Sequence, residues 1–129
     1  MKLLLDTHAL LWWLSDDKRL GAHPRALIED PGNDVLVSVV SLWEIAVKVR
    51  IGKLEADVAE IASVIEDEGL TLVAIGVPHL LALLGLPKHH RDPFDHLLMA
   101  QAIVEDAAFV SGDRFNLRYP VQVVGCADR

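Results

Sequence analysis

Residues 1–14 read MKLLLDTHALLWWL, and this stretch decides the fold. Its apolar run, residues 3–5, is short and ends in a charged residue, which predicts a buried strand. Asp6 closes the run, and Thr7 can cap a helix over residues 8–14. A strand, an acidic residue and a helix therefore follow one another directly, as at the start of a β–α unit.

The rest of the chain alternates in the same way. Apolar runs predict further strands at residues 35–39, 70–74, 107–111 and 121–124. Helical patterns fall between them, at residues 24–29, 41–52, 57–68, 77–84 and 93–106. This alternation predicts an α/β fold: a three-layer α/β/α sandwich whose mainly parallel sheet is covered by helices on both faces.

Composition limits the possible classes of protein. A length of 129 residues fits one domain across residues 1–129, and 52% hydrophobic residues exclude a disordered chain. Acidic residues outnumber basic ones 19 to 12, for a net charge of −7. That balance argues against binding nucleic acid by bulk positive charge. A bound cation could still reverse the sign of a small cleft.

The expected compartment is the cytoplasm. The single cysteine, Cys126, cannot form an internal disulfide, which suits a reducing environment. No apolar run approaches the roughly 18–20 residues that a membrane span needs. Because Asp6 and His8 interrupt the apolar start, we expect no signal peptide.

Acidic residues fall where the predicted strands end. Asp6 follows the first strand, Glu44 lies one turn into the helix after the second, and Asp113 follows residues 107–111. The carboxyl ends of parallel strands meet at one edge of a sheet, so these three residues should lie together. Asp95, in the first turn of the helix at residues 93–106, joins them only if that helix start folds back.

Such a cluster suggests a cation site. Neighbouring carboxylates repel one another unless a proton or a cation lies among them. Oxygen ligands without cysteine favour Mg²⁺ or Mn²⁺ over Zn²⁺, and such sites serve phosphodiester hydrolysis.

Each acidic residue also has a purely structural interpretation. Asp6 could cap the helix after it, and Ser41-x-x-Glu44 has the spacing of a capping box. Asp95 could complement a helix dipole, and Asp113 could be a turn residue. Asp92, before Pro93, is best explained as a helix cap.

Segments with these residues carry a family resemblance. They are LLLDTH at 3–8, VVSLWEI at 39–45, RDPFDHLLMAQA at 91–102 and VSGD at 110–113. In this order, they resemble a PIN-domain ribonuclease of the VapC type, the toxin of a bacterial or archaeal toxin–antitoxin pair. The resemblance covers nearly the whole chain and implies an endoribonuclease that depends on Mg²⁺, with Mn²⁺ as a possible substitute.

The resemblance also implies roles for particular residues. Asp6 and Asp95 would be the main direct metal ligands, and Glu44 and Asp113 would ligate directly or through water. These four acids would be the catalytic set for hydrolysis by a metal-activated water. Two hydroxyls would support the ligands, those of Thr7 and Ser111.

The implied partners are an RNA substrate, a second copy of the chain and a VapB-type antitoxin that silences the site. Leucines at 80, 81, 83 and 84 make one predicted helix apolar over much of its circumference, which suggests a subunit interface or the core. Possible RNA phosphate contacts are basic residues that could also form an ordinary exposed face: Lys48, Lys88, Arg91 and His96.

Two other functions compete with this interpretation. A phospho-receiver domain would need paired acids near the first strand and a lysine after the last, whereas Asp6 stands alone and no lysine follows residues 121–124. A catalytically inactive PIN-like module that only binds a partner would not need acids at all four positions.

Overall fold

The computed structural model describes residues 1–88, 92–113 and 119–127. Its centre is a five-stranded sheet in which every pairing is parallel, in the order β3-β2-β1-β4-β5. The strands are β1 (Lys2–Leu5), β2 (Asp34–Ser38), β3 (Thr71–Val73), β4 (Ala108–Ser111) and β5 (Val123–Gly125). Residue Leu4 of β1 is in register with Leu36 of β2 on one side and with Phe109 of β4 on the other.

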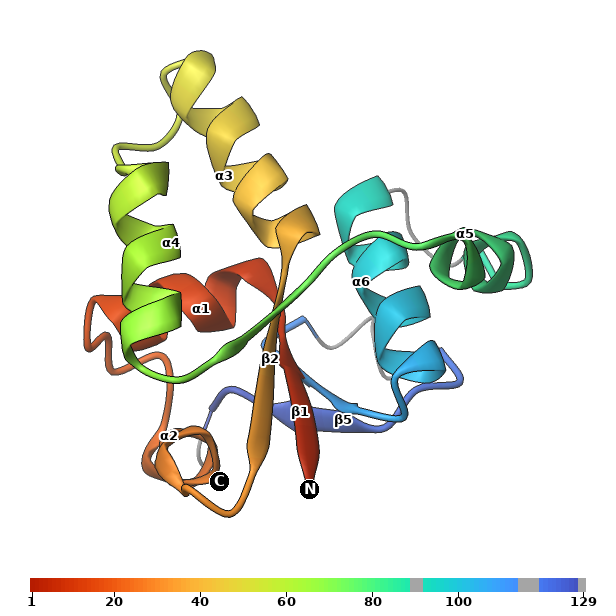
Figure 1. The fold of residues 1–129 in the computed structure, drawn as a ribbon, viewed down its shortest axis with the longest axis horizontal. Helices are drawn as coiled ribbons and strands as arrows, with labels where there is room; N and C mark the ends of the chain where they lie inside the picture. The colour runs from red at the N-terminus through yellow and green to blue at the C-terminus, as the bar shows by residue number, and fades with distance from the viewer. Residues whose placement is uncertain (89–91, 114–118, 128–129) are drawn as a thin grey trace.

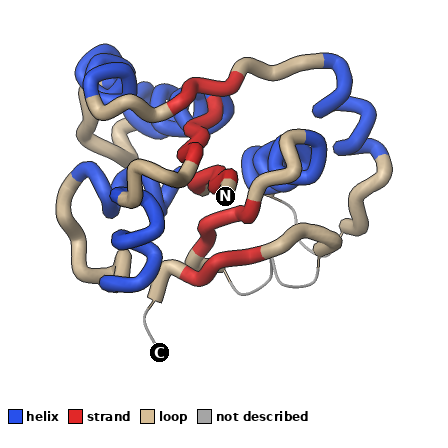
Figure 2. The backbone as a smooth tube through the Cα atoms, turned by 60° about the horizontal axis from the view of Figure 1, so that its bottom comes forward, coloured by secondary structure: helices blue, strands red, loops and turns tan. Residues whose placement is uncertain are grey.

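Helices cover both faces of the sheet, as Figures 1 and 2 show. They are α1 (Thr7–Leu14), α2 (Ala22–Glu29), α3 (Val39–Arg50), α4 (Val58–Asp67), α5 (Val77–Leu84) and α6 (Pro93–Val104). In Figure 1, α1, α2 and α4 lie on one side of the strands and α5 and α6 on the other. The predicted three-layer α/β/α architecture with a parallel sheet is confirmed.

The central strand β1 explains why the sheet has a core on each face. Side chains alternate along a strand, so Leu3 and Leu5 join one apolar cluster and Leu4 joins the other. All three leucines are fully buried. A strand buried on both faces is typical of parallel sheets covered by helices.

The starts of α1 and α3 differ from the prediction. Asp6, not Thr7, is the N-cap of α1, because its carboxylate accepts a hydrogen bond from the Ala9 amide at 2.7 Å. Helix α3 begins earlier than expected, at Val39, because the Ser38 hydroxyl accepts a hydrogen bond from the Val40 amide.

The capping-box interpretation of Ser41-x-x-Glu44 is therefore wrong. Both residues lie inside α3 and are buried. Asp92 is the N-cap of α6, as expected, and accepts hydrogen bonds from the amides of Phe94 and Asp95.

The leucines of α5 are not core residues, with one exception. Leu80, Leu81 and Leu84 are 46%, 63% and 83% exposed, whereas the partly buried Leu83 packs against the second core. The subunit interface remains the prediction for the exposed ones. Among the described residues, no helix has the length and apolar character to cross a membrane.

Replacement of a core side chain gives a first test. Phe109 is fully buried on β4, within the cluster that α6 covers. We expect Phe109→Ala to lower the free energy of unfolding by about 3–5 kcal/mol, measured by urea denaturation. The control Ile51→Ala, at a position 59% exposed, should change it by less than about 0.5 kcal/mol. Equal losses in the two variants would contradict this assignment of the core.

Candidate active site

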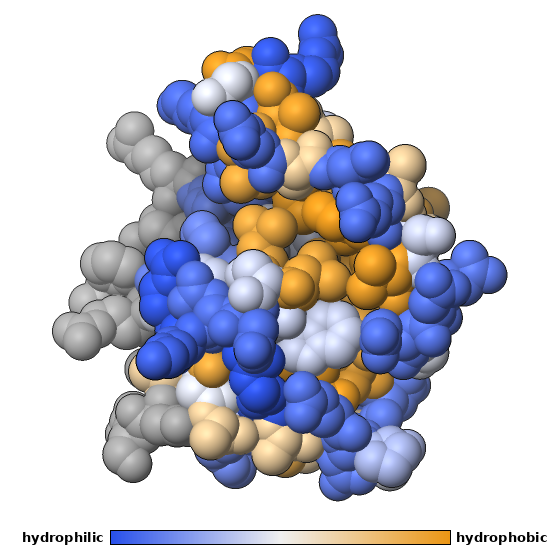
Figure 3. All heavy atoms as spheres, turned by 90° about the vertical axis from the view of Figure 1, so that its left-hand side faces the viewer, coloured by the Kyte–Doolittle hydropathy of each residue, from blue (hydrophilic) through white to orange (hydrophobic). Residues whose placement is uncertain are grey.

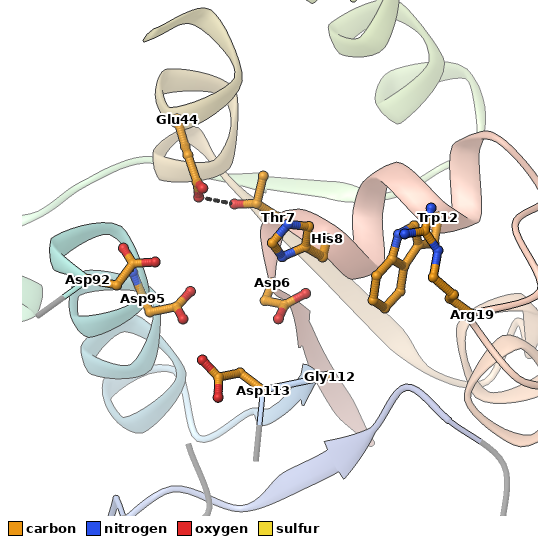
Figure 4. Close-up of a pocket in the computed structure, with 10 residues that line it drawn as sticks. All are labelled: Asp6, Thr7, His8, Trp12, Arg19, Glu44, Asp92, Asp95, Gly112 and Asp113. Carbon is orange, nitrogen blue, oxygen red and sulfur yellow. Dashed lines mark hydrogen bonds between the residues drawn. The ribbon is translucent and has the colours of Figure 1, made fainter. Parts of the chain in front are cut away.

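A cavity of about 320 Å³ opens beyond the carboxyl ends of β1 and β4. Its lining comes from three helices, a connection and two strand ends: Asp6, Thr7, His8, Trp12, Arg19, Glu44, Asp92, Asp95, Gly112 and Asp113. All four acids expected to share a site line this one cavity, and Asp92 adds a fifth carboxylate. Figure 4 shows the carboxylates of Asp6, Asp95 and Asp113 around a common space, which Glu44 approaches from α3.

The fold brings these acids together from distant parts of the chain. Asp6 directly follows β1, and its backbone amide donates to the Val110 carbonyl of β4 at 2.9 Å, which fixes the two strand ends side by side. Asp113 follows β4 by two residues. The start of α6 folds back to the same edge, so Asp95 in its first turn reaches the cavity. The spacing of these acids in the sequence could not by itself establish that Asp95 joins the others.

Burial makes the negative charge of these acids costly. Desolvation raises the pKa of Asp6 above its usual value, although hydrogen bonds from the Ala9 amide and Ser111 oppose the shift. Desolvation also raises the pKa of Asp95 to about 7, and the charges of neighbouring carboxylates, Asp92 first, add to the effect. Without a cation, the site therefore tends to keep a proton.

Glu44 is held from both sides. The Thr7 hydroxyl donates to its Oε1 at 2.6 Å and lies 3.1 Å from the Ser41 hydroxyl. The Lys48 ammonium donates to Oε2 at 2.7 Å. Thr7 and Lys48 thus orient the Glu44 carboxylate, and the Lys48 ammonium balances its charge.

A family model, the PIN domain, matches residues 3–118. The chain belongs to the PIN-domain family. No curated protein sequence is similar enough to be matched.

Solved structures resemble this PIN domain over almost its whole length. The VapBC2 complex of Rickettsia felis, bound to a DNA fragment from its promoter, gives a TM-score of 0.75 at 16% identity. DNA-bound VapBC from Salmonella typhimurium gives 0.67 at 13%, and VapBC-1 from nontypeable Haemophilus influenzae gives 0.61 at 14%. Each match covers 97% of this chain and 98% of the other. At these identities, the likeness establishes the fold.

The other residues expected in the site are more scattered. The Ser111 hydroxyl accepts a hydrogen bond from the Asp113 amide at 3.1 Å. Lys48 pairs with Glu44, Lys88 is exposed, and Nε2 of His96 lies 3.0 Å from the Tyr119 hydroxyl. Neither Lys88 nor His96 is among the described residues that line the cavity. Arg91 lies outside the described residues.

Sequence reasoning missed three residues of the wall. The His8 and Trp12 rings stack with centroids 5.7 Å apart, and the Arg19 guanidinium lies 5.0 Å from the centre of the Trp12 ring. The first two could have been found, because positions four apart share a helix face, here the one beside Asp6. Arg19 could not, since its position depends on the path of the chain between α1 and α2.

The donor set of this PIN domain suits a hard cation. Asp6, Asp95, Glu44 and Asp113 offer only oxygen, and the raised pKa of Asp6 and Asp95 reflects the cost of desolvating their charges. Within the described residues, no three acidic, histidine or cysteine side chains lie close enough together to form a preorganised metal site.

The pKa of Asp95 predicts how stability depends on pH. Between its usual value of 3.8 and about 7, folded Asp95 keeps a proton that the unfolded chain releases. The metal-free protein should therefore lose stability as pH rises through this window. We expect Asp95→Asn to melt at least about 3 °C above the wild type at about pH 8 in EDTA, with a smaller gap near pH 5.

The matched control is Asp67→Asn, which removes one charge from an exposed position at the end of α4. Its effect on the melting temperature should not grow between those two pH values. A lower melting temperature for Asp95→Asn at about pH 8 would show that the carboxylate stabilises the fold, contrary to the repulsion inferred above.

Proposed function

We propose that this PIN domain, over residues 1–129, is the toxin of a VapBC-type toxin–antitoxin pair and a Mg²⁺- or Mn²⁺-dependent endoribonuclease of the cytoplasm. The observation that carries the proposal is the convergence of Asp6, Glu44, Asp95 and Asp113 on one cavity. Four acids from separate elements in one recess are costly unless a cation binds there.

Asp6 and Asp95 would hold the metal directly, and Glu44 and Asp113 would do so directly or through water. When bound, the cation would neutralise phosphate charge, acidify a water molecule and stabilise the leaving oxygen of an RNA phosphodiester. Asp95 has to lose its proton for this, so the affinity for the cation should rise with pH up to about 7.

The remaining contacts prepare the site before substrate arrives. Thr7 and Lys48 already fix the Glu44 carboxylate, so little of its motion remains to be lost on binding. Lys48 is 38% exposed, so its ammonium could also face a phosphate. With Lys88, Arg91 and His96, it completes the proposed set of phosphate contacts.

The antitoxin belongs to the same proposal because the similar structures are VapBC complexes. The side of the molecule that carries α1, α2 and α4 shows apolar side chains in its middle, with hydrophilic ones around them (Figure 3). Such a surface suits an apolar partner segment, and an arginine of that partner would pair with Glu44 or Asp113. A homodimer is proposed as well, through the exposed leucines of α5.

Cleavage of RNA is the direct test. With Mg²⁺, the wild type should cut members of a panel of structured RNAs. EDTA, Asp6→Asn and Asp95→Asn should each abolish cutting, because each removes the cation or one of its main ligands. Asp67→Asn, outside the cavity, should cut like the wild type. Full activity of Asp95→Asn would contradict its role as a ligand.

Cation binding can be measured apart from catalysis. We expect Mg²⁺ to raise the melting temperature of the wild type at about pH 8 and to leave that of Asp95→Asn unchanged, because only a ligand bound by the folded state stabilises it. If Mg²⁺ stabilised the wild type but no RNA were cut, an inactive partner-binding module would be the better interpretation.

The toxin role predicts an effect on cells. Induced expression in a bacterium should arrest growth, and Asp95→Asn should relieve the arrest. So should co-expression of a small protein encoded immediately upstream, as the antitoxin would be. If the purified protein cut RNA but its induced expression left growth normal, the toxin role would be refuted. The nuclease assignment would still hold.

A further inference from the structure

A second, larger groove of about 1380 Å³ adjoins the acidic cavity. One wall is the connection between α1 and α2, including Lys18 and Arg19, and the other is β5 with the residues that follow it. Trp12, Arg19, Gly112 and Asp113 line both spaces, so the groove continues from the cavity.

The sign of the charge changes where the two spaces meet. The acidic cavity holds five carboxylates, whereas the described lining of the groove holds one, that of Asp113, beside the cations Lys18 and Arg19. A polyanion whose reacting phosphate enters the acidic cavity would find cationic groups for its next phosphates in this direction. The groove therefore marks a path away from the acids.

Arg19 is held in place at this junction. Its Nε and Nη2 donate to the Asp17 carboxylate at 3.1 and 2.7 Å, and its guanidinium lies over the Trp12 ring. Asp17 lines neither space, so it holds Arg19 from outside and leaves Nη1 out of these bonds. Such an arginine is oriented before it meets an anion, which lowers the entropy cost of binding.

Trp12 is fixed in turn by close packing. A Cβ atom on Gly112 would lie 3.3 Å from Cζ3 of Trp12, so a side chain there would press against the ring and displace it slightly. His8 stacks on the same ring. Trp12 is thus a positioning residue that places the Arg19 guanidinium between the two spaces.

We propose that Arg19 binds a phosphate adjacent to the one cleaved, and that single-stranded RNA runs from the acidic cavity over Trp12 and Arg19 into the groove. This inference rests on the proposed ribonuclease function. A single strand is the form that suits it, because its backbone can bend into a recessed site and follow a cationic groove, which a stiff duplex cannot.

The test uses a single-stranded RNA oligonucleotide that the wild type cuts at one position in Mg²⁺. We expect Arg19→Ala to raise KM about tenfold, because a charged hydrogen bond is lost, and to leave kcat within about twofold. The slope of log(kcat/KM) against log salt should become shallower by about 0.7, the value for one phosphate contact on a single strand. The control Lys53→Ala, an exposed cation that lines neither space, should change neither quantity.

Asp17→Asn separates phosphate binding from a structural role. It keeps the Arg19 charge, so the salt slope should stay that of the wild type. If Asp17→Asn and Arg19→Ala raised KM and lowered the melting temperature alike, Arg19 would only anchor the connection between α1 and α2, and the proposal would be wrong.

Neutral methylphosphonate linkages, introduced one at a time along the oligonucleotide, locate the contact. At one position next to the scissile phosphate, the modification should weaken RNA binding by the wild type. The same modification should not further weaken RNA binding by Arg19→Ala, which already lacks the contact. Additive losses at every position would overturn the proposal while leaving the ribonuclease function intact. So would an unchanged KM for RNA with weaker antitoxin binding, which would assign Arg19 to the protein partner. No cleavage by the wild type would instead refute the proposed function itself.

Discussion

The position of β1 is the constraint on which the rest of the molecule depends. It lies in the middle of the sheet, with β2 on one side and β4 on the other, and its leucines are fully buried. The chain continues outward through β2 and β3 and later returns to add β4 and β5 on the other side. The strand order reverses at β1, and in open parallel sheets such a reversal leaves a crevice at the carboxyl ends of the strands. Asp6 stands at that point.

The crevice works against the stability of the folded chain. It gathers carboxylates whose burial raises the pKa of Asp6 and Asp95. Local contacts offset part of the cost: the Ala9 amide donates to Asp6, and Asp95 lies in the first turn of α6, where the helix dipole favours negative charge. The two apolar clusters that flank the sheet supply the stability that the site does not. Function and folding are thus divided between the edge of the sheet and its middle.

Much of this arrangement could be predicted from the sequence. Alternating apolar runs and helical patterns were enough to predict the layers and the parallel sheet, because strands joined by helical crossover connections can adopt few other topologies. The same topology placed Asp6, Glu44 and Asp113 at one edge, and the residues around Asp92 marked the start of α6. The boundary between β2 and α3 was less predictable, since Val39 and Val40 favour a strand locally but a hydrogen bond to Ser38 draws them into the helix.

The path of the chain between α1 and α2 could not be predicted. Asp16 adopts a left-handed conformation there, with φ of 53°, which non-glycine residues rarely do. That turn, in which the amides of Asp16 and Asp17 donate to the carbonyls of Trp13 and Trp12, brings Arg19 back over α1. Trp12, whose ring lies under the Arg19 guanidinium, borders both the acidic cavity and the groove beside it. An indole in that position is a built-in optical reporter: with Trp13 and Trp43 replaced by phenylalanine, its emission would register an ion or an oligonucleotide entering either space, with no label attached.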